Sequence, residues 1–361
     1  MNFKLLGLVA GLALVAGCKS EPKADAPTAT PAADPAAAAK PAIDKALLAA
    51  FGKLPASIDR KEGPASEAMV SLGRALYYDT RLSKNHDLSC NSCHDLAAYG
   101  VDGKAFSPGH KGQLGGRNSP TVYNAAGRHV QFWDGRAADV EEQALGPVMN
   151  PVEMAMPDEA RVVETLRSIP GYVEMFAKAF PDEKDPVTFL NMGKAIGAFE
   201  RGLVTPSRWD RFLGGEEDAL TDEEKAGFNA FVSAGCTACH SGTYVGGAMF
   251  QKLGLVHPWP SDKDLGRYDV TKAEADKMMF SVPTLRNIAK TAPYFHDGSV
   301  ETLDEAVRLM AKHQVGKDLS DAEVKSIVAF LGTLTGEIPE AYIAKPDLPE
   351  STDKTPKPDP T

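Results

Sequence analysis

Hydrophobic residues recur at helical spacing in several separate stretches of the chain. In residues 320–332 a Ser-Asp-Ala-Glu capping sequence precedes apolar residues at positions i, i+3, i+4 and i+7. Residues 221–235 have the same organisation, with a Thr-Asp-Glu-Glu capping box, an apolar face and a final glycine. Further helical patterns lie at about 70–77, 139–147, 158–169 and 187–202. Alternating strand patterns are scarce, so the chain is predicted to be mostly α-helical.

Two cysteine-containing pentapeptides follow predicted helices. They are Cys90-Asn91-Ser92-Cys93-His94 and Cys236-Thr237-Ala238-Cys239-His240. In a C-x-x-C-H sequence the two thiols bond the vinyl groups of one porphyrin and the histidine binds its iron, which makes this the attachment sequence of c-type haem. A zinc site or a redox dithiol is the alternative, but only 5 cysteines and 8 histidines occur in the chain, which disfavours two chance copies. The chain is therefore predicted to hold two covalent haems, each at the core of its own domain.

The first residues have the composition of a bacterial lipoprotein signal. Lys4 is followed by an apolar run over residues 5–15 and by small residues just before Cys18. By resemblance to that class, cleavage before Cys18 and acylation of this residue give a lipid anchor as the sole membrane contact, with a plain secretory signal as the alternative. No second run of ~18 apolar residues follows, so no transmembrane helix is expected. The predicted location is the periplasm, and Lys19 and Ser20 favour the outer membrane over the inner one.

Composition divides the remainder of the chain. The composition of an Ala/Pro-rich tract predicts a disordered tether, and that of the Pro/Lys/Asp-rich end predicts a disordered tail. The predicted parts are a signal peptide at 1–17, the tether at 18–42, an N-terminal haem domain at 43–205, a C-terminal haem domain at 206–344 and the tail at 345–361.

Charge excludes one class of partner. The net charge is −10, with 49 acidic and 39 basic residues, and no basic cluster stands out. Nucleic acid is therefore not an expected partner. The acidic surface could attract a basic redox partner or be an ordinary solvated surface.

Four further segments resemble bacterial dihaem cytochrome c peroxidases. They are Gly116–Thr121, Phe132–Arg136, Val282–Asn287 and Ala292–Gly298. The resemblance covers about residues 45–340. It implies two cytochrome c-like domains and the reduction of hydrogen peroxide to water with electrons from a small c-type cytochrome or a cupredoxin. Relatives in this family are often dimers, which makes a homodimer one expected state.

The resemblance also implies roles at the N-terminal, peroxidatic haem. His94 is the expected iron ligand, and His110, in a loop rich in Gly and Pro, the expected removable second ligand. Heterolysis of peroxide needs a group that moves a proton between its two oxygens. Glu153 matches the family's acid/base residue and Gln143 its orienting residue.

At the C-terminal, electron-accepting haem the expected ligands are His240 and a thioether, since Met/His ligation raises the reduction potential. Met310 fits best, because it stands shortly before the final predicted helix. The other downstream candidates are Met249, Met278 and Met279.

Two features are expected between the haems. Trp133 resembles the tryptophan that lies there in this family, where it could assist electron transfer or simply pack against both domains. Asn118, with the backbone carbonyls of Thr291 and Pro293, matches a Ca²⁺ site with oxygen ligands.

The expected mechanism uses one electron from each haem, and reduction of the C-terminal haem releases His110 from the other. Two other functions remain open. Enzymes that oxidise tryptophan residues of a partner protein share this architecture but use Tyr as the second-haem ligand, for which Tyr294 is close in sequence. A non-enzymatic dihaem electron carrier or redox sensor is the other alternative, which the Gln143/Glu153 pair disfavours.

Overall fold

The computed structural model describes residues 42–60 and 63–361. The predicted signal peptide, Cys18 and residues 18–41 of the predicted tether lie outside this part of the chain. The described residues cluster as one compact unit. In the part that is described, no helix has the length and apolar character needed to cross a membrane.

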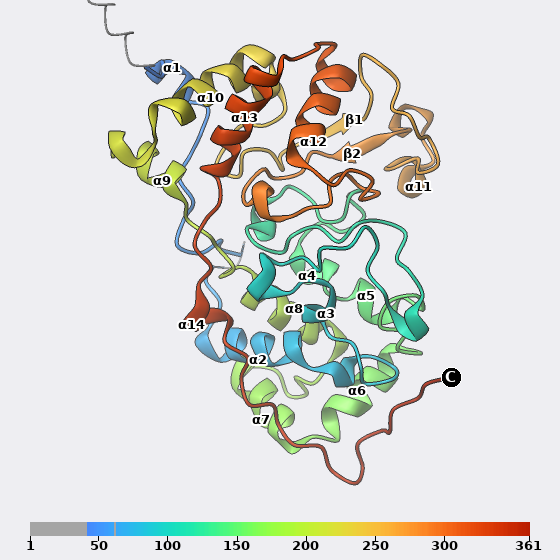
Figure 1. Ribbon diagram of the computed structural model, residues 1–361. Coiled ribbons are helices and arrows are strands. Elements are labelled where there is room, and N and C mark those ends of the chain that lie inside the picture. The colour runs from blue at the N-terminus through green and yellow to red at the C-terminus, as the bar shows by residue number, and fades with distance from the viewer. Residues whose placement is uncertain (1–41, 61–62) are drawn as a thin grey trace, which may run out of the picture. The chain divides into compact units, whose positions relative to one another are not determined.

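Helices dominate the regular structure, as predicted from the periodicity (Figure 1). Their bounds are α1 Lys45–Leu48, α2 Glu67–Tyr78, α3 Cys90–Cys93, α4 Val140–Gln143, α5 Gly146–Met149, α6 Glu159–Arg167, α7 Pro170–Ala179, α8 Phe189–Glu200, α9 Arg208–Leu213, α10 Asp222–Ala234, α11 Tyr268–Thr271, α12 Leu303–Met310, α13 Asp321–Gly332 and α14 Glu340–Ile343. One antiparallel pair, β1 Phe250–Lys252 and β2 Met279–Ser281, has Phe250 opposite Ser281.

Local sequence signals explain where several helices begin and end. The predicted capping boxes are present at the starts of α10 and α13. The predicted helical stretch at 139–147 is instead two single-turn helices, α4 and α5. Pro147 has no amide hydrogen to donate to the carbonyl of Gln143, so one continuous helix cannot form there.

Two main hydrophobic cores lie on either side of the predicted boundary between residues 205 and 206. The first is built around α2, α7 and α8, and the second around α10 and α13. Each contains a glycine that permits close helix packing: a Cβ on Gly73 would lie 1.8 Å from the carbonyl oxygen of Ala195, and one on Gly227 would lie 2.0 Å from that of Ser326. Ile343 of α14 belongs to the first core, so the chain returns to that core after α13.

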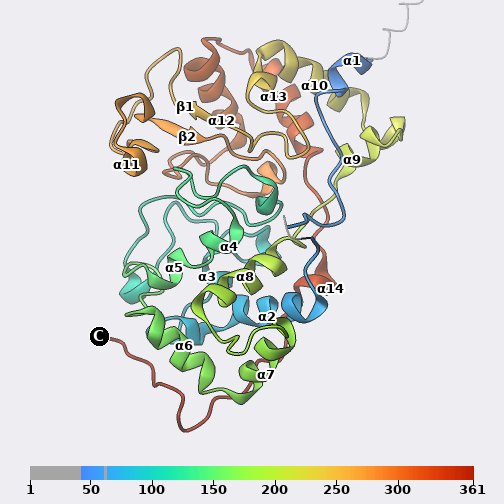
Figure 2. The same cartoon turned by 180° about the vertical axis from the view of Figure 1, so that it is seen from behind.

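The segment after Ala344 has a defined path, whereas its composition predicts a disordered tail. It runs past α7 and the end of α6 in both views (Figures 1 and 2). Thr352 Oγ1 donates to the carbonyl of Ser168 at 2.8 Å, and Ser168 Oγ donates to the buried Thr355 Oγ1 at 3.0 Å. Leu348 packs against the first core. These tertiary partners, which composition does not reveal, give the polar segment its order.

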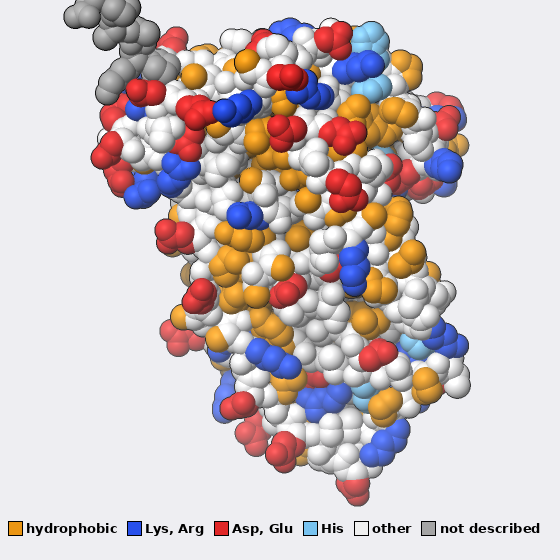
Figure 3. Space-filling view, in the orientation of Figure 1, with side chains coloured by type: hydrophobic (Ala, Val, Ile, Leu, Met, Phe, Trp, Pro, Cys, Tyr) orange, Lys and Arg blue, Asp and Glu red, His pale blue; other side chains and the backbone are white. Residues whose placement is uncertain are grey.

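Figure 3 shows acidic and basic groups interspersed on the face in view. Neither sign of charge is gathered into one region of this face.

Candidate active site

The N-terminal C-x-x-C-H motif lines a cavity of about 1200 Å³. The single turn of α3 carries Cys90 and Cys93, whose thiols are free. His94 follows directly, and its backbone carbonyl accepts a hydrogen bond of 2.8 Å from the Tyr77 hydroxyl. Its Nδ1 lies 3.4 Å from the Gly100 carbonyl, a contact that suits an Nδ1–H donor and leaves Nε2 as the metal-binding nitrogen. Burial lowers the pKa of His94, which favours the neutral imidazole that a metal requires.

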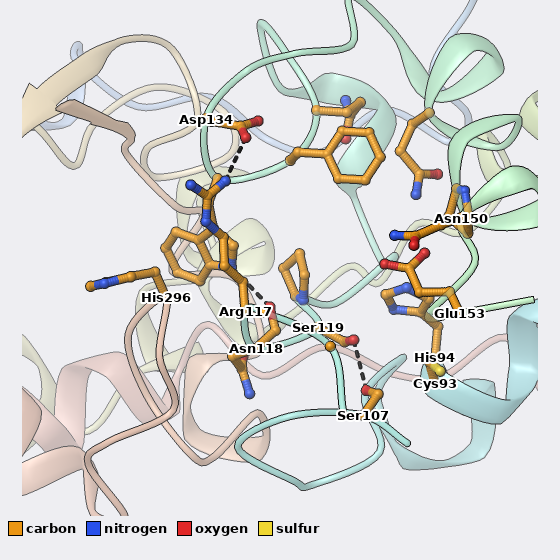
Figure 4. A pocket seen from close by; sticks show the side chains of 18 of the residues that line it. Cys93, His94, Ser107, Arg117, Asn118, Ser119, Asp134, Asn150, Glu153 and His296 are labelled. Carbon is orange, nitrogen blue, oxygen red and sulfur yellow. Dashed lines mark hydrogen bonds and ion pairs between the residues drawn. The ribbon is translucent and has the colours of Figure 1, made fainter. Parts of the chain in front are cut away.

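The two expected catalytic side chains line this same cavity. Gln143 is the last residue of α4, and Glu153 lies in the loop after α5. Figure 4 shows the Glu153 carboxylate and the Asn150 amide turned into the cavity on the side of His94. Burial raises the pKa of Glu153 above its ordinary value, although Arg136 and the Asn150 side chain act in the opposite direction. The fold therefore brings an acid/base group and an amide donor to one space beside the predicted haem ligand.

His110 lies elsewhere. It is buried but does not line the cavity, and its Nε2 is 3.3 Å from the carbonyl oxygen of Thr361. Its backbone amide donates to the Glu153 carbonyl at 2.8 Å. Lys111 and Gly112 both have positive φ, at 60° and 72°. The structure thus places the predicted second ligand on a turn attached to the Glu153 loop, facing the end of the chain.

A second cavity of about 410 Å³ is lined by the C-terminal motif and by Met310. Met310 is the last residue of α12, and the alternatives Met249, Met278 and Met279 do not line this cavity. Burial of the imidazole lowers the pKa of His240 to about 4, and its buried Nδ1 has no hydrogen-bond partner among the described residues. Free thiols, a neutral histidine and a mainly apolar wall fit a covalently attached haem.

One wall is shared by the two cavities. Both are lined by residues 118–121, Arg128, Trp133 and His296. Trp133 donates from its indole nitrogen to the Asn118 carbonyl at 2.9 Å, and its ring meets that of His296 edge-on, with centroids 6.4 Å apart. Trp133 therefore lies between the two predicted haem sites.

The three residues expected to bind calcium all line the second cavity. The Asn118 amide nitrogen donates to the Lys104 carbonyl at 2.9 Å. Within residues 42–60 and 63–361, neither Asn118 Oδ1 nor the carbonyl oxygens of Thr291 and Pro293 accept a hydrogen bond. The same residues contain no group of three or more His, Cys, Asp or Glu side chains arranged for a metal, so a cation here would rely on neutral oxygens.

Sequence reasoning did not single out three residues that line the first cavity: Asn150, Arg128 and Glu200. Burial, with a contribution from Glu141, raises the pKa of Glu200 to about 8. Arg128 and Glu200 show no local sequence signal, since a charged residue in a loop or at a helix end is usually exposed. Asn150 could have been noticed from its place between Pro147 and Pro151, three residues before Glu153.

Comparison with known proteins finds similar chains over most of this sequence. A family model described as di-haem cytochrome c peroxidase matches residues 67–218. The cytochrome c551 peroxidase of Pseudomonas aeruginosa is 46% identical over 324 residues, which cover 88% of this chain and 92% of that protein. The cytochrome c551 peroxidase of Nitrosomonas europaea is 46% identical over 299 residues, covering 82% and 88%. Among solved structures, a MauG-like protein associated with microbial copper homeostasis aligns with a TM-score of 0.70 and 33% identity, covering 81% of this chain and 95% of that one.

Proposed function

Because the chain belongs to the di-haem cytochrome c peroxidase family, we propose that it reduces hydrogen peroxide to water with electrons from a small c-type cytochrome or a cupredoxin. The observation that carries the proposal is the cavity in which Glu153 and Gln143 meet the N-terminal haem-attachment motif. Such a cavity has what peroxide cleavage requires: a haem ligand, a proton carrier and a hydrogen-bond donor.

The chain's own residues would orient peroxide and move its proton. The haem attached at Cys90 and Cys93 supplies electron transfer at its iron when it is bound. Glu153 takes the proton from one peroxide oxygen and delivers it to the other, which leaves as water when the O–O bond breaks. Two electrons and two further protons complete the balance, H2O2 + 2H⁺ + 2e⁻ giving two waters. The Gln143 amide donates a hydrogen bond that fixes which oxygen faces Glu153.

Several finer assignments extend this proposal. His94 would hold the N-terminal haem, and His110 would be its removable second ligand in a state in which its turn has moved away from Thr361. His240 and Met310 would hold the C-terminal haem, with Trp133 on the electron path between the two. Asn118 Oδ1 and the carbonyls of Thr291 and Pro293 would bind Ca²⁺. The absence of hydrogen bonds to these oxygens supports that assignment.

The predicted signal sequence supports a periplasmic protein that is anchored through acylated Cys18. Lys19 and Ser20 favour the outer membrane over the inner one as the site of the anchor. We also propose two haem domains, one before and one after the boundary between residues 205 and 206. The two hydrophobic cores support a division near this point, although Ile43, Leu48 and Phe51 pack against the second core and Ile343 belongs to the first.

The tryptophan-oxidising alternative is less well supported. Tyr294 does line the second cavity, but its hydroxyl donates to the Ile288 carbonyl at 3.2 Å, and Met310 lines the same cavity. A thioether opposite His240 fits the peroxidase assignment better than a tyrosine ligand.

Glu153→Gln tests the proposed chemistry, because it keeps the side chain's shape and removes its ability to carry a proton. With both haems attached, we expect the rate of peroxide-dependent oxidation of a reduced small c-type cytochrome to fall about 10²–10⁴-fold, the usual range for a lost general acid/base. Glu174→Gln is the matched control, since Glu174 is exposed on α7 and should retain the full rate. A Glu153→Gln protein with two haems and the wild-type rate would remove Glu153 from the mechanism, and a wild-type protein without turnover would refute the function.

A further inference from the structure

Arg128 is a buried cation without an anion. Its exposed fraction is 8%, and it lies just after the short 3₁₀ helix formed by residues 125–127. One guanidinium nitrogen, Nη2, donates to the Ser281 hydroxyl at 3.1 Å, while the buried Nε has no hydrogen-bond partner in the part of the chain that the structure describes. None of the ion pairs among the described residues includes Arg128, and burial alone lowers its pKa to about 10. A guanidinium removed from water and left unpaired is unfavourable unless a bound anion completes its environment.

The position of Arg128 indicates where that anion lies. Arg128 belongs to the wall shared by the two cavities. Of the described residues that line the second cavity, it is the only one with a formal charge, because the rest are apolar or neutral polar groups and burial lowers the pKa of both His240 and His296. The first cavity, by contrast, is lined by several charged residues, and one of its cations, Arg117, already forms an ion pair with Asp134.

The surrounding residues hold the arginine at this wall. Ser281 is fully buried and ends β2. Gly247, with φ of 74°, lies against the arginine stem, and a Cβ there would come within 3.1 Å of Arg128 Cγ. The Gly247 carbonyl also accepts a hydrogen bond of 2.8 Å from the backbone amide of His129. The segment that follows the second haem motif therefore clamps Arg128 in place.

We propose that Arg128 binds a propionate of the haem attached at Cys236 and Cys239. A haem carries two propionates, and the described lining of the second cavity offers no other charged group to receive them. A planar guanidinium with a free donor edge suits bidentate binding of a carboxylate. This inference rests on haem attachment and not on peroxide reduction.

A cation held at this haem raises its reduction potential, because added electron density is stabilised by the nearby positive charge. Arg128 would thus help to make the C-terminal haem the electron acceptor of the pair. Since it also lines the first cavity, its charge acts at the boundary between the two centres.

The test is a spectroelectrochemical titration of the full, haem-loaded chain with Arg128→Gln, Arg128→Lys and Ser281→Ala. Haem content is measured first, so that loss of a haem is distinguished from a shift in potential. We expect Arg128→Gln to reduce the one-electron equilibrium constant of the higher-potential haem at least tenfold, which corresponds to 59 mV. Arg128→Lys keeps the charge and Ser281→Ala keeps the arginine, so each should change that constant less than threefold.

Resonance Raman spectra give a second readout if Arg128→Gln fails to fold or to bind haem. Arg128→Lys replaces the planar fork with a single ammonium, so the propionate vibrations of the haem should shift relative to wild type. Unchanged potentials in a two-haem Arg128→Gln protein, or unchanged propionate vibrations in Arg128→Lys, would overturn the proposal and leave Arg128 with a packing role only.

Discussion

A buried ion pair behind the second haem motif provides a quantitative test of the structure. Arg286 has an exposed side-chain fraction of 0%, and its Nη1 donates to Asp210 Oδ2 at 2.6 Å. The same carboxylate accepts the backbone amides of Leu54 and Ser207, each at 2.8 Å. Nη2 of Arg286 donates to the Thr243 carbonyl at 2.7 Å. The Asp210 carboxylate thus connects α9 to the segment around Leu54 and to the loop that contains Arg286, next to the second cavity.

Asp210→Asn should destabilise the protein substantially. The change leaves the guanidinium buried without its counter-charge, and breaking one partner of a buried pair costs about 3–5 kcal/mol. At about 3 °C per kcal/mol, the expected fall in Tm is about 9–15 °C. The double variant Asp210→Asn/Arg286→Met should lose less than the sum of the two single variants, because it leaves no unpaired charge.

Thermal unfolding of the haem-loaded chain, followed by circular dichroism at pH 7, measures these shifts. Glu216→Gln is the control, since Glu216 pairs with Arg211 at 3.7 Å on the surface, where both side chains are more than half exposed, and should cost under about 1 kcal/mol. If Asp210→Asn melted within about 2 °C of wild type, the reasoning about this pair would be refuted.

The same pair makes a prediction about pH. Burial raises the pKa of Asp210, but Arg286 and the backbone donors outweigh it and hold that pKa below its ordinary value. A depressed folded-state pKa adds stability that is complete above the unfolded value of about 3.9 and is lost as pH falls through the folded value. The difference in free energy of unfolding between wild type and Asp210→Asn should therefore be largest above about pH 4 and shrink below it. A difference that stayed constant down to acid unfolding would contradict this assignment.

Two further substitutions, each with a control variant, test the helix packing and the second haem. Gly73→Ala would push a Cβ to 1.8 Å from the Ala195 carbonyl and separate α2 from α8, so we expect a loss of about 1–3 kcal/mol in thermal unfolding. Gly332→Ala, at the end of α13 where nothing lies within 4 Å, should be neutral or slightly stabilising, and equal stability of the two variants would argue against the close contact. Met310→His should lower the higher reduction potential by on the order of 0.1 V in a redox titration, since it replaces a thioether ligand with an imidazole. Met279→Leu should leave the potential unchanged, and the opposite pattern would assign the ligand to Met279.

The family, the helical character and the haem-attachment motifs were all accessible from the sequence. Capping boxes and apolar periodicity act within a few residues, so α10 and α13 could be predicted from local sequence. The proposed roles of Glu153, Gln143 and Met310 rest on resemblance to a family, since a single carboxylate, amide or thioether has no local signature. What the structure added is that these residues line the cavities of the two motifs.

Tertiary structure decided the features that depend on residues far apart in the chain. The polar end of the chain is ordered because Ser168 and the first core receive it, and His110 lies against Thr361 rather than in the cavity. The unpaired charge of Arg128 arises only when the segment around Gly247 and Ser281 closes over it. The spacing of the haem-attachment motifs and the helix periodicity are local, so they can be recognised in the sequence. Burial and charge pairing depend instead on which distant segments pack together.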